Sequence, residues 1–204
     1  MDLIRNALKT ICDQANTYLA NIDPRPDSWV VLTSLVDHGG AINDSARDKI
    51  VMVVYNITRD AFASSYQPTA PASPGANHRQ GLPVTAPPLY LNVHLMFMAN
   101  FTEDAYPDGL AALSRVIEYF QQTSTFTPQN APKLSPEIDQ LALEFENLTT
   151  IDVNYVMSML GTRYLPSAFY KLRMIPFAPS AMVARTYPVA GAATGISPGA
   201  NAAP

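Results

Sequence analysis

The side chains of this sequence that are best suited to acid–base or metal chemistry are three histidines, His38, His78 and His94. His38 stands before two glycines, as in an oxyanion loop, but no Gly-x-Ser-x-Gly element follows it, and we interpret it as a turn residue. His78 lies in a proline-rich segment, which is unsuited to a fixed catalytic geometry. His94 has no second ligand at a suitable spacing, so we expect a satisfied or solvent-facing side chain rather than a metal ligand.

Two carboxylates are also candidates, because Glu144 and Glu146 alternate in the run LALEFENL and share one face of a predicted strand. Like charges at this spacing can raise the pKa of one carboxyl group and make it a catalytic acid. The alternative is a solvated or ion-paired face, for which Lys171 and Arg173 supply a matching pair of cations on another strand. We favour the second interpretation and hypothesise that these four residues form complementary charge pairs at or near a subunit boundary.

No other residues complete a catalytic or cofactor site. Cys12 is the single cysteine, which excludes an internal disulfide and a cysteine-based zinc site, and its place beside a helical apolar stripe indicates a packed side chain. The glycines near the C-terminus lack the strand–glycine–helix context of a phosphate-binding loop. We therefore predict that the protein is not an enzyme and holds no cofactor and no metal.

Composition excludes several classes of partner. The formal net charge is −4 and the basic residues are scattered, so nucleic acid is not expected to bind. No run reaches the roughly 18 consecutive apolar residues that cross a bilayer, and charges interrupt the N-terminus where a signal peptide would lie. We expect assembly in the cytoplasm without direct membrane insertion. Charged residues make up only 15% of the chain, which suits a surface covered by neighbouring subunits.

Hydrophobic periodicity predicts the elements that position these residues. Apolar residues at spacings of three and four predict helices over residues 3–19 and about 107–122. The spacing of Thr149 and Asp152 is a capping signature for a short third helix that Gly161 ends. Strands are predicted at 28–36, 49–57, 87–101, 141–148 and 168–177, with the first two as an antiparallel pair. The result is an α+β domain: a single mixed or antiparallel sheet of about five strands with about three flanking helices.

The predicted strand at 87–101 has the sequence PPLYLNVHLMFMANF, and its alternation defines a core face and a more polar face. The core face comprises Leu89, Leu91, Val93, Leu95 and Phe97. The polar face comprises Tyr90, Asn92, His94, Met96 and Met98. This strand is therefore expected to be part of the frame of the domain rather than the bearer of a catalytic histidine.

Two segments stand apart from the predicted elements. Residues 1–177 are expected to form the α+β domain, with a proline-rich insertion at 60–88 that interrupts it. Residues 178–204 are a Pro/Gly/Ala-rich C-terminal arm, which is either disordered or ordered by a partner because it offers too little apolar area to offset its ordering entropy.

Four pieces of sequence, PPLYLN, FTPQN, LEFENL and YLPSAFYKLRM, occur in an order that resembles the cap proteins of phage-tail-like contractile injection systems. That family is also catalogued as an N-terminal domain of unknown function, and the resemblance covers roughly residues 2–177. It implies a tail-terminator fold and a structural role as a ring, a hexamer by analogy with contractile tails. Such a ring ends the inner tube and the contractile sheath and caps the particle.

The partners that the resemblance implies are further copies of the chain and the sheath and inner-tube proteins of a particle that is either released or anchored. The insertion and the arm lie outside the matching pieces, so an adaptor that tethers the particle or a cargo through them is the alternative function. In the arm, MVARTYPV is the only apolar, β-prone run. We hypothesise that it lies extended against a sheath subunit, through Val183, Arg185, Tyr187 and Val189.

Overall fold

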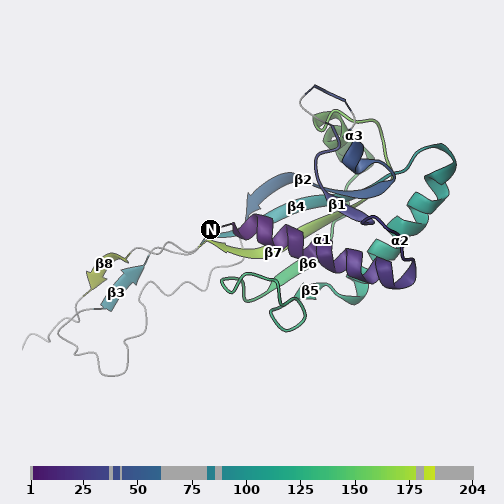
Figure 1. Ribbon diagram of the computed structural model, residues 1–204. Coiled ribbons are helices and arrows are strands. Elements are labelled where there is room, and N and C mark those ends of the chain that lie inside the picture. Colours follow the sequence, from purple (N-terminus) through teal and green to yellow (C-terminus); the bar gives the residue numbers. More distant parts are fainter. Residues whose placement is uncertain are drawn as a thin grey trace, which may run out of the picture. The chain divides into compact units, whose positions relative to one another are not determined.

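The computed structural model describes residues 2–36, 39–41, 43–60, 82–85, 89–177 and 182–186 (Figure 1). The chain divides into two compact units, and each unit is formed by two segments of the chain. The first unit comprises Met1–Ser64 and Pro88–Phe177, and the second comprises Ser65–Pro87 and Ala178–Pro204. Most of the insertion and the whole arm, which are distant in the sequence, therefore belong to the same unit.

Within the described residues, the first unit is built on a sheet of six strands: β1 Val30–Leu32, β2 Lys49–Arg59, β4 Leu89–Asn100, β5 Thr125–Phe126, β6 Leu141–Phe145 and β7 Ser167–Phe177. Their order is β1-β2-β4-β7-β6-β5, and all neighbours are antiparallel except β1 and β2. The sheet is mixed and the domain is α+β, which confirms the predicted fold class. The short strand β5 adds to the five strands that the sequence predicts.

The antiparallel pairing expected for the first two strands is wrong, because β1 runs parallel to β2, with Val30 opposite Ile50. A tight turn cannot join parallel neighbours, which need a crossover that returns the chain to the same end of the sheet. The connection here contains a 3₁₀ helix, η1 (Asp44–Ala46), whose N-cap Asn43 accepts a hydrogen bond from the backbone N–H of Ser45. The glycine pair that resembles a hairpin turn therefore lies inside a longer crossover.

Helices cover both faces of the sheet. α1 (Leu3–Ile22) and α2 (Tyr106–Gln122) confirm the two predicted long helices and pack on one face, whereas α3 (Thr150–Met159) packs on the other (Figure 1). The side chains buried between the sheet and the two long helices include Ile11, Leu19, Ile50, Met52, Leu95, Phe97, Val116 and Phe120. This cluster is the larger of the two cores.

The ends of α3 are fixed by the residues that the sequence singles out. Thr149 Oγ1 accepts from the backbone N–H of Asp152, and Asp152 Oδ2 accepts from the backbone N–H of Thr149. This reciprocal capping box satisfies two backbone donors that the helix leaves free. Gly161 has a φ of 68° just beyond the last turn, a conformation that favours glycine and ends the helix. The predicted start and end of this helix are confirmed.

The C-terminal half of β4 is buried on both of its faces. The predicted core face is buried at Val93, Leu95 and Phe97, whereas Leu89 is 39% exposed and Leu91 is half-buried. The expectation that Met96 and Met98 lie on a polar face is wrong, because α3 covers that part of the sheet and buries both. The second, smaller core therefore lies on the side of the sheet that the alternation of β4 marks as polar.

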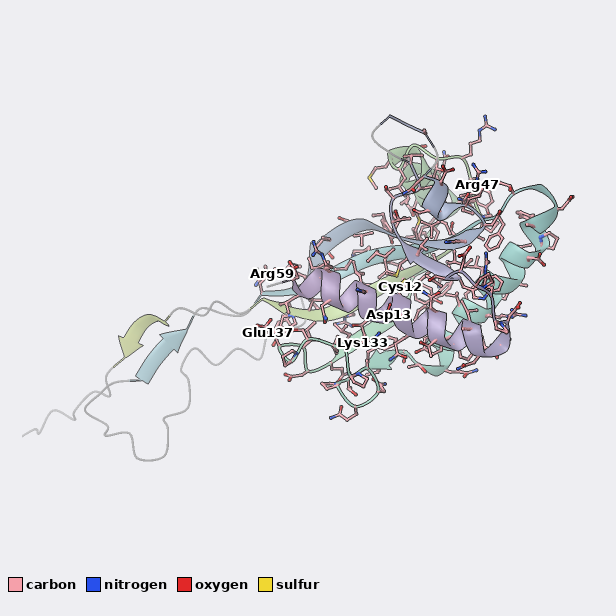
Figure 2. All side chains as sticks on the ribbon, in the orientation of Figure 1. Cys12, Asp13, Arg47, Arg59, Lys133 and Glu137 are labelled. Atoms are coloured by element: carbon pink, nitrogen blue, oxygen red, sulfur yellow. The ribbon has the colours of Figure 1, made fainter. Side chains whose placement is uncertain are left out.

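The connection between β5 and β6 is irregular, and it closes one end of the larger core. Its buried side chains are Ala131, Leu134 and Ile138. Polar contacts tie it to α1: Asn6 Oδ1 accepts from the backbone N–H of Ser135 at 2.6 Å, and Lys133 Nζ lies 3.0 Å from Asp13 Oδ2 (Figure 2). An irregular segment can be part of the core here because a helix supplies partners for its backbone groups.

The second unit contains two described strands, β3 (Leu82–Thr85) and β8 (Met182–Thr186), which form an antiparallel pair. Leu82 lies opposite Thr186 in this pair. The sequence predicts no strand in the proline-rich insertion, but β3 lies there, and it pairs with the extended run expected in the arm. No local sequence pattern signals this pairing, because the two strands are about a hundred residues apart.

α2 approaches the end of β4 closely at a glycine. A Cβ atom on Gly109 would lie 2.7 Å from Phe101 Cδ2 and 2.9 Å from Phe101 Cβ. Phe101 is itself buried and its ring lies 6.5 Å from the ring of Trp29. The absence of a side chain at Gly109 therefore sets the distance between the helix and the buried aromatic ring.

We expect Gly109→Ala to lower the free energy of unfolding by roughly 1–3 kcal/mol, because the new methyl group overpacks against Phe101. In an exposed helix the same substitution would be stabilising by about 1 kcal/mol. Urea denaturation measures the change. The control is Gly109→Ala in a Phe101→Ala background, where the substitution should be neutral or stabilising; an equal loss in both backgrounds would contradict the steric explanation.

Candidate assembly surface

Beside the area that α3 covers, the second face of the sheet carries a cluster of polar side chains. This polar cluster comprises Tyr55, Thr58, Asp60, His94, Glu144, Glu146, Lys171 and Arg173. The register of the strands brings its centre together, because His94 of β4 and Glu144 of β6 both lie opposite Lys171 of β7. A bulge between Val54 and Asn56 in β2 accommodates Tyr55.

Glu144 forms the cross-strand ion pairs that the sequence suggests, and it forms them within one chain. Its Oε1 accepts from Arg173 Nη1 at 2.9 Å, and its Oε2 lies 3.8 Å from Lys171 Nζ. Arg173 also donates to the buried carboxylate of Asp60, with Nη2 and Oδ2 3.2 Å apart. Arg173 therefore links two carboxylates. That this group lies at a subunit boundary remains a prediction.

Glu146 lies on the same side of the sheet as Glu144 but has different partners. Its Oε2 accepts from the Tyr55 hydroxyl at 2.9 Å and lies 2.8 Å from His94 Nδ1. The other ring nitrogen of His94, Nε2, lies 2.9 Å from Thr58 Oγ1. His94 is therefore a satisfied histidine, as the sequence predicts. Sequence reasoning missed that Glu146 and Tyr55 belong to its network, since Tyr55 lies in β2, His94 in β4 and Glu146 just after β6.

The network keeps Glu146 in its charged form. Burial alone would raise the pKa of Glu146, but hydrogen bonds from His94 and Tyr55 and the attraction of His94 and Lys171 outweigh it and hold the pKa below its ordinary value. Burial, together with the hydrogen bond to Glu146 and its charge, raises the pKa of Tyr55, so its hydroxyl stays protonated and donates. A charged carboxylate that accepts two hydrogen bonds is stable at this half-buried position.

Thr58, His94 and Glu146 form a hydroxyl–imidazole–carboxylate series, the order of groups found in hydrolytic triads. A triad also needs backbone donors that face a developing oxyanion next to the nucleophile. Thr58 instead lies within β2, where it is paired with Asn92 of β4. The Tyr55 hydroxyl also donates a hydrogen bond to the carboxylate of Glu146. We interpret the series as a structural network that satisfies polar groups on the sheet.

Among the residues that the structure describes, the other chemistry-bearing side chains offer no second site. Burial raises the pKa of the Cys12 thiol to about 11, so it is a packed side chain and not a nucleophile at neutral pH. Among the described residues, no group of three or more His, Cys, Asp or Glu side chains could hold a metal ion. In the same part of the chain, no helix combines the length and apolarity that crossing a bilayer requires. His38 and His78 lie outside the described residues.

The outer side of α3 exposes a row of apolar side chains, Ile151, Tyr155 and Met159, which we call the α3 ridge. Their exposed fractions are 67%, 69% and 62%. The opposite side of the same helix packs on the sheet. A groove of about 670 Å³ runs between α3 and the following segment, where Tyr164 is 71% exposed. Exposed apolar side chains that lie next to one another are typical of contact surfaces, which makes the ridge a candidate for one.

Tyr155 and Tyr164 have no individual role in the predictions made from the sequence. The signal that could have found the ridge is the composition of residues 150–160, which are apolar all round the helix rather than on one stripe. In the arm, Val183 and Arg185 lie in β8, and Arg185 is opposite Pro83. Tyr187 and Val189 lie outside the described residues. Contact of the arm with a sheath subunit remains a prediction.

The first unit is thus an α+β domain whose described surface offers an apolar ridge and a paired polar cluster rather than a catalytic arrangement. Residues 3–190 match the Pvc16 N-terminal domain family, and the chain belongs to this family. The match confirms the resemblance found in the sequence and extends it through the insertion and into the arm. No curated protein sequence matches the chain.

Solved structures with the same fold include a sheath/tube terminator and a tube-terminating cap. One is the sheath/tube terminator of an extracellular contractile injection system, PVC, in its extended state, with a TM-score of 0.60 and 12% identity over 98% of this chain. The other is the tube-terminating cap of the anti-feeding prophage, with a TM-score of 0.59 and 15% identity over 98% of this chain. The chain spans 65% and 63% of the length of these two proteins. At this identity the likeness is one of fold.

The polar network predicts how stability depends on pH. The pKa of Glu146 is lowered in the folded chain, so its contribution is complete above the ordinary value of 4.5 and is lost as the pH falls through the lower folded value. We expect Glu146→Gln to lower the free energy of unfolding by on the order of 1 kcal/mol at neutral pH, because the amide accepts weaker hydrogen bonds. The difference from the unsubstituted chain should shrink below about pH 4.5.

Urea denaturation over a series of pH values measures this difference. The matched control is Glu137→Gln, since Glu137 is an exposed glutamate of the connection before β6 (Figure 2). The control should unfold like the unsubstituted chain at every pH. A destabilisation by Glu146→Gln that stays constant down to pH 3 would show that the carboxylate charge is not what the network stabilises.

Proposed function

We propose that this chain is a structural cap that ends the inner tube and the contractile sheath of a phage-tail-like contractile injection particle. The observation that carries the proposal is the agreement of the fold with two solved terminator caps over 98% of the chain, together with family membership. The chain has no enzymatic step in this role. It assembles in the cytoplasm and becomes part of a particle.

The cap acts as a closed ring of identical copies, a hexamer by analogy with the symmetry of contractile tails. A cyclic ring of more than two copies needs two different surfaces on each copy that fit one another, because a contact between two identical surfaces closes with only two copies. It also needs a rigid body, which the sheet with helices on both faces supplies. Its further partners are the last tube and sheath subunits that it meets.

Two sets of residues are proposed to meet neighbours in this assembly. The first is the paired group of Glu144, Lys171 and Arg173 with the nearby Glu146, placed at or near a subunit boundary. The second is the arm around residues 183–189, placed against a sheath subunit. A two-stranded sheet such as β3–β8 is only marginally stable by itself, and its outer edges can accept a further strand from a partner.

The terminator role predicts the length of the particle. In a particle-producing strain that lacks this protein, we expect overlong or unstable sheaths and tubes, because nothing stops addition of subunits at the end distal to the baseplate. Electron microscopy of purified particles measures the length distribution, and expression of the chain from a plasmid should restore it. Particles of normal length with altered attachment would contradict termination and favour an adaptor.

The arm is tested by truncation. Deleting residues 179–204 removes β8, and we expect weaker binding to sheaths while the ring remains intact, because the residues proposed for the subunit boundary, Glu144, Lys171 and Arg173, belong to the first unit. Co-sedimentation with assembled sheaths and native mass spectrometry measure the two properties. The matched control deletes residues 190–204 only, which keeps residues 182–189 and should bind sheaths like the full chain. Equal binding by all three forms would contradict a role of the arm.

A further inference from the structure

Two helices of the first unit expose side chains in rows that repeat every four residues. On α3 this is the α3 ridge. On α2 it is the row Tyr106, Leu110, Ser114 and Glu118, which we call the α2 row. Tyr106 is 46% exposed and Leu110 is 39% exposed. Rows of residues four apart are the ridges by which two helices interdigitate when they pack.

The two rows cannot cover each other within one chain. α2 packs on one face of the sheet together with α1, and α3 packs on the opposite face (Figure 1). The body of the sheet therefore separates them. A second copy of the chain is free of this restriction, because its α2 row can approach the α3 ridge of the first copy from outside.

The charges beside the two rows have opposite signs. Arg163 lines the groove next to the α3 ridge and is exposed. Glu118 lies four residues beyond Ser114 in the α2 row and is also exposed. Within the described part of the chain, neither Arg163 nor Glu118 takes part in a salt bridge. Complementary charges at the rim of an apolar contact fix its register and exclude the wrong orientation.

The shapes of the two surfaces are also complementary. The groove of about 670 Å³ beside α3 is concave, and its lining combines apolar and aromatic side chains such as Ile151 and Tyr155 with polar ones such as Asn154 and Arg163. The α2 row is convex, because it stands on the outside of a helix, and it begins with an aromatic and a leucine side chain. Aromatic side chains that enter a pocket supply much of the binding energy of protein interfaces.

The geometry points to a contact between neighbouring copies of this chain, in which the α2 row of one copy binds the α3 ridge and groove of the next. Tyr106 and Leu110 enter the groove, and Glu118 pairs with Arg163 of the neighbour. The contact joins two different surfaces and is therefore heterologous, as a ring requires. This inference rests on the proposed ring and adds which surfaces close it.

Reciprocal charge reversal tests the contact in the full chain. We expect Arg163→Glu and Glu118→Arg each to raise the protein concentration needed for ring assembly by roughly three- to tenfold, and the double variant to restore it. Tyr155→Ala removes an anchor of the ridge and should raise that concentration by roughly tenfold or more. Native mass spectrometry and light scattering over a dilution series, at low salt, measure assembly.

The matched control is Lys9→Glu, which reverses an exposed charge on α1 away from both rows. It should assemble like the unsubstituted chain, and thermal unfolding should be the same for all variants because the substituted side chains are exposed. Weakening by both single reversals with rescue in the double variant supports the contact. A ring that forms equally well in every variant overturns the contact and leaves the proposed ring intact.

Two further outcomes would also overturn the inference. If the reversals leave the ring unchanged but weaken co-sedimentation with sheaths, the α3 ridge binds a sheath subunit and not a second copy. If the unsubstituted chain stays monomeric at every concentration, both the contact and the proposed ring are wrong, which distinguishes this failure from the previous one.

Discussion

The side chains of β4 alternate between two layers of packing, and the positions of all three helices follow from this alternation. Leu95 and Phe97 lie under α1 and α2, while Met96 and Met98 lie under α3. A strand that is apolar on both faces is stable only when both faces are shielded from water, so helices must pack on each face of the sheet. Because β4 lies between β2 and β7, the helices on each face cover β4 together with its neighbouring strands.

The cover on the second face is incomplete, because α3 is short. Where the helix no longer reaches, the strands carry polar side chains in place of methionines. Their groups are only partly exposed, and such groups destabilise a fold unless they find partners. His94, Glu146 and Arg173 each have partners on more than one strand or segment. The hydrogen bonds and ion pairs of the polar cluster thus hold the strands together where the apolar core ends.

Much of the fold could be predicted from local patterns. The two long helices follow from their apolar stripes, and the ends of α3 follow from Thr149, Asp152 and Gly161. Each of these signals involves residues within a few positions of one another. The α+β class follows from the order of the elements, since a strand-rich chain with three helical segments has few ways to bury all its apolar faces.

The features that escaped prediction depend on pairings between distant residues. Whether β1 runs parallel or antiparallel to β2 depends on the path of the crossover and not on the sequence of either strand. The pairing of β3 with β8 joins the insertion to the arm, and the sequence of neither strand indicates which strand it pairs with. The partners of Glu146 depend on the bulge at Tyr55 and on the register of β4, which a single strand cannot report.

The polar cluster and the α3 ridge differ in how strongly they require a partner. Ion pairs within the chain already join Glu144 to Lys171 and Arg173. A neighbouring subunit would have to displace or extend these pairs before they could add to the binding free energy. The α3 ridge has no such internal compensation: its three side chains remain more than half exposed. Removing that apolar area from water is favourable for any partner of matching shape. In the assembly of copies that we propose, the ridge therefore supplies the driving force, while charged side chains contribute to the orientation of the contact.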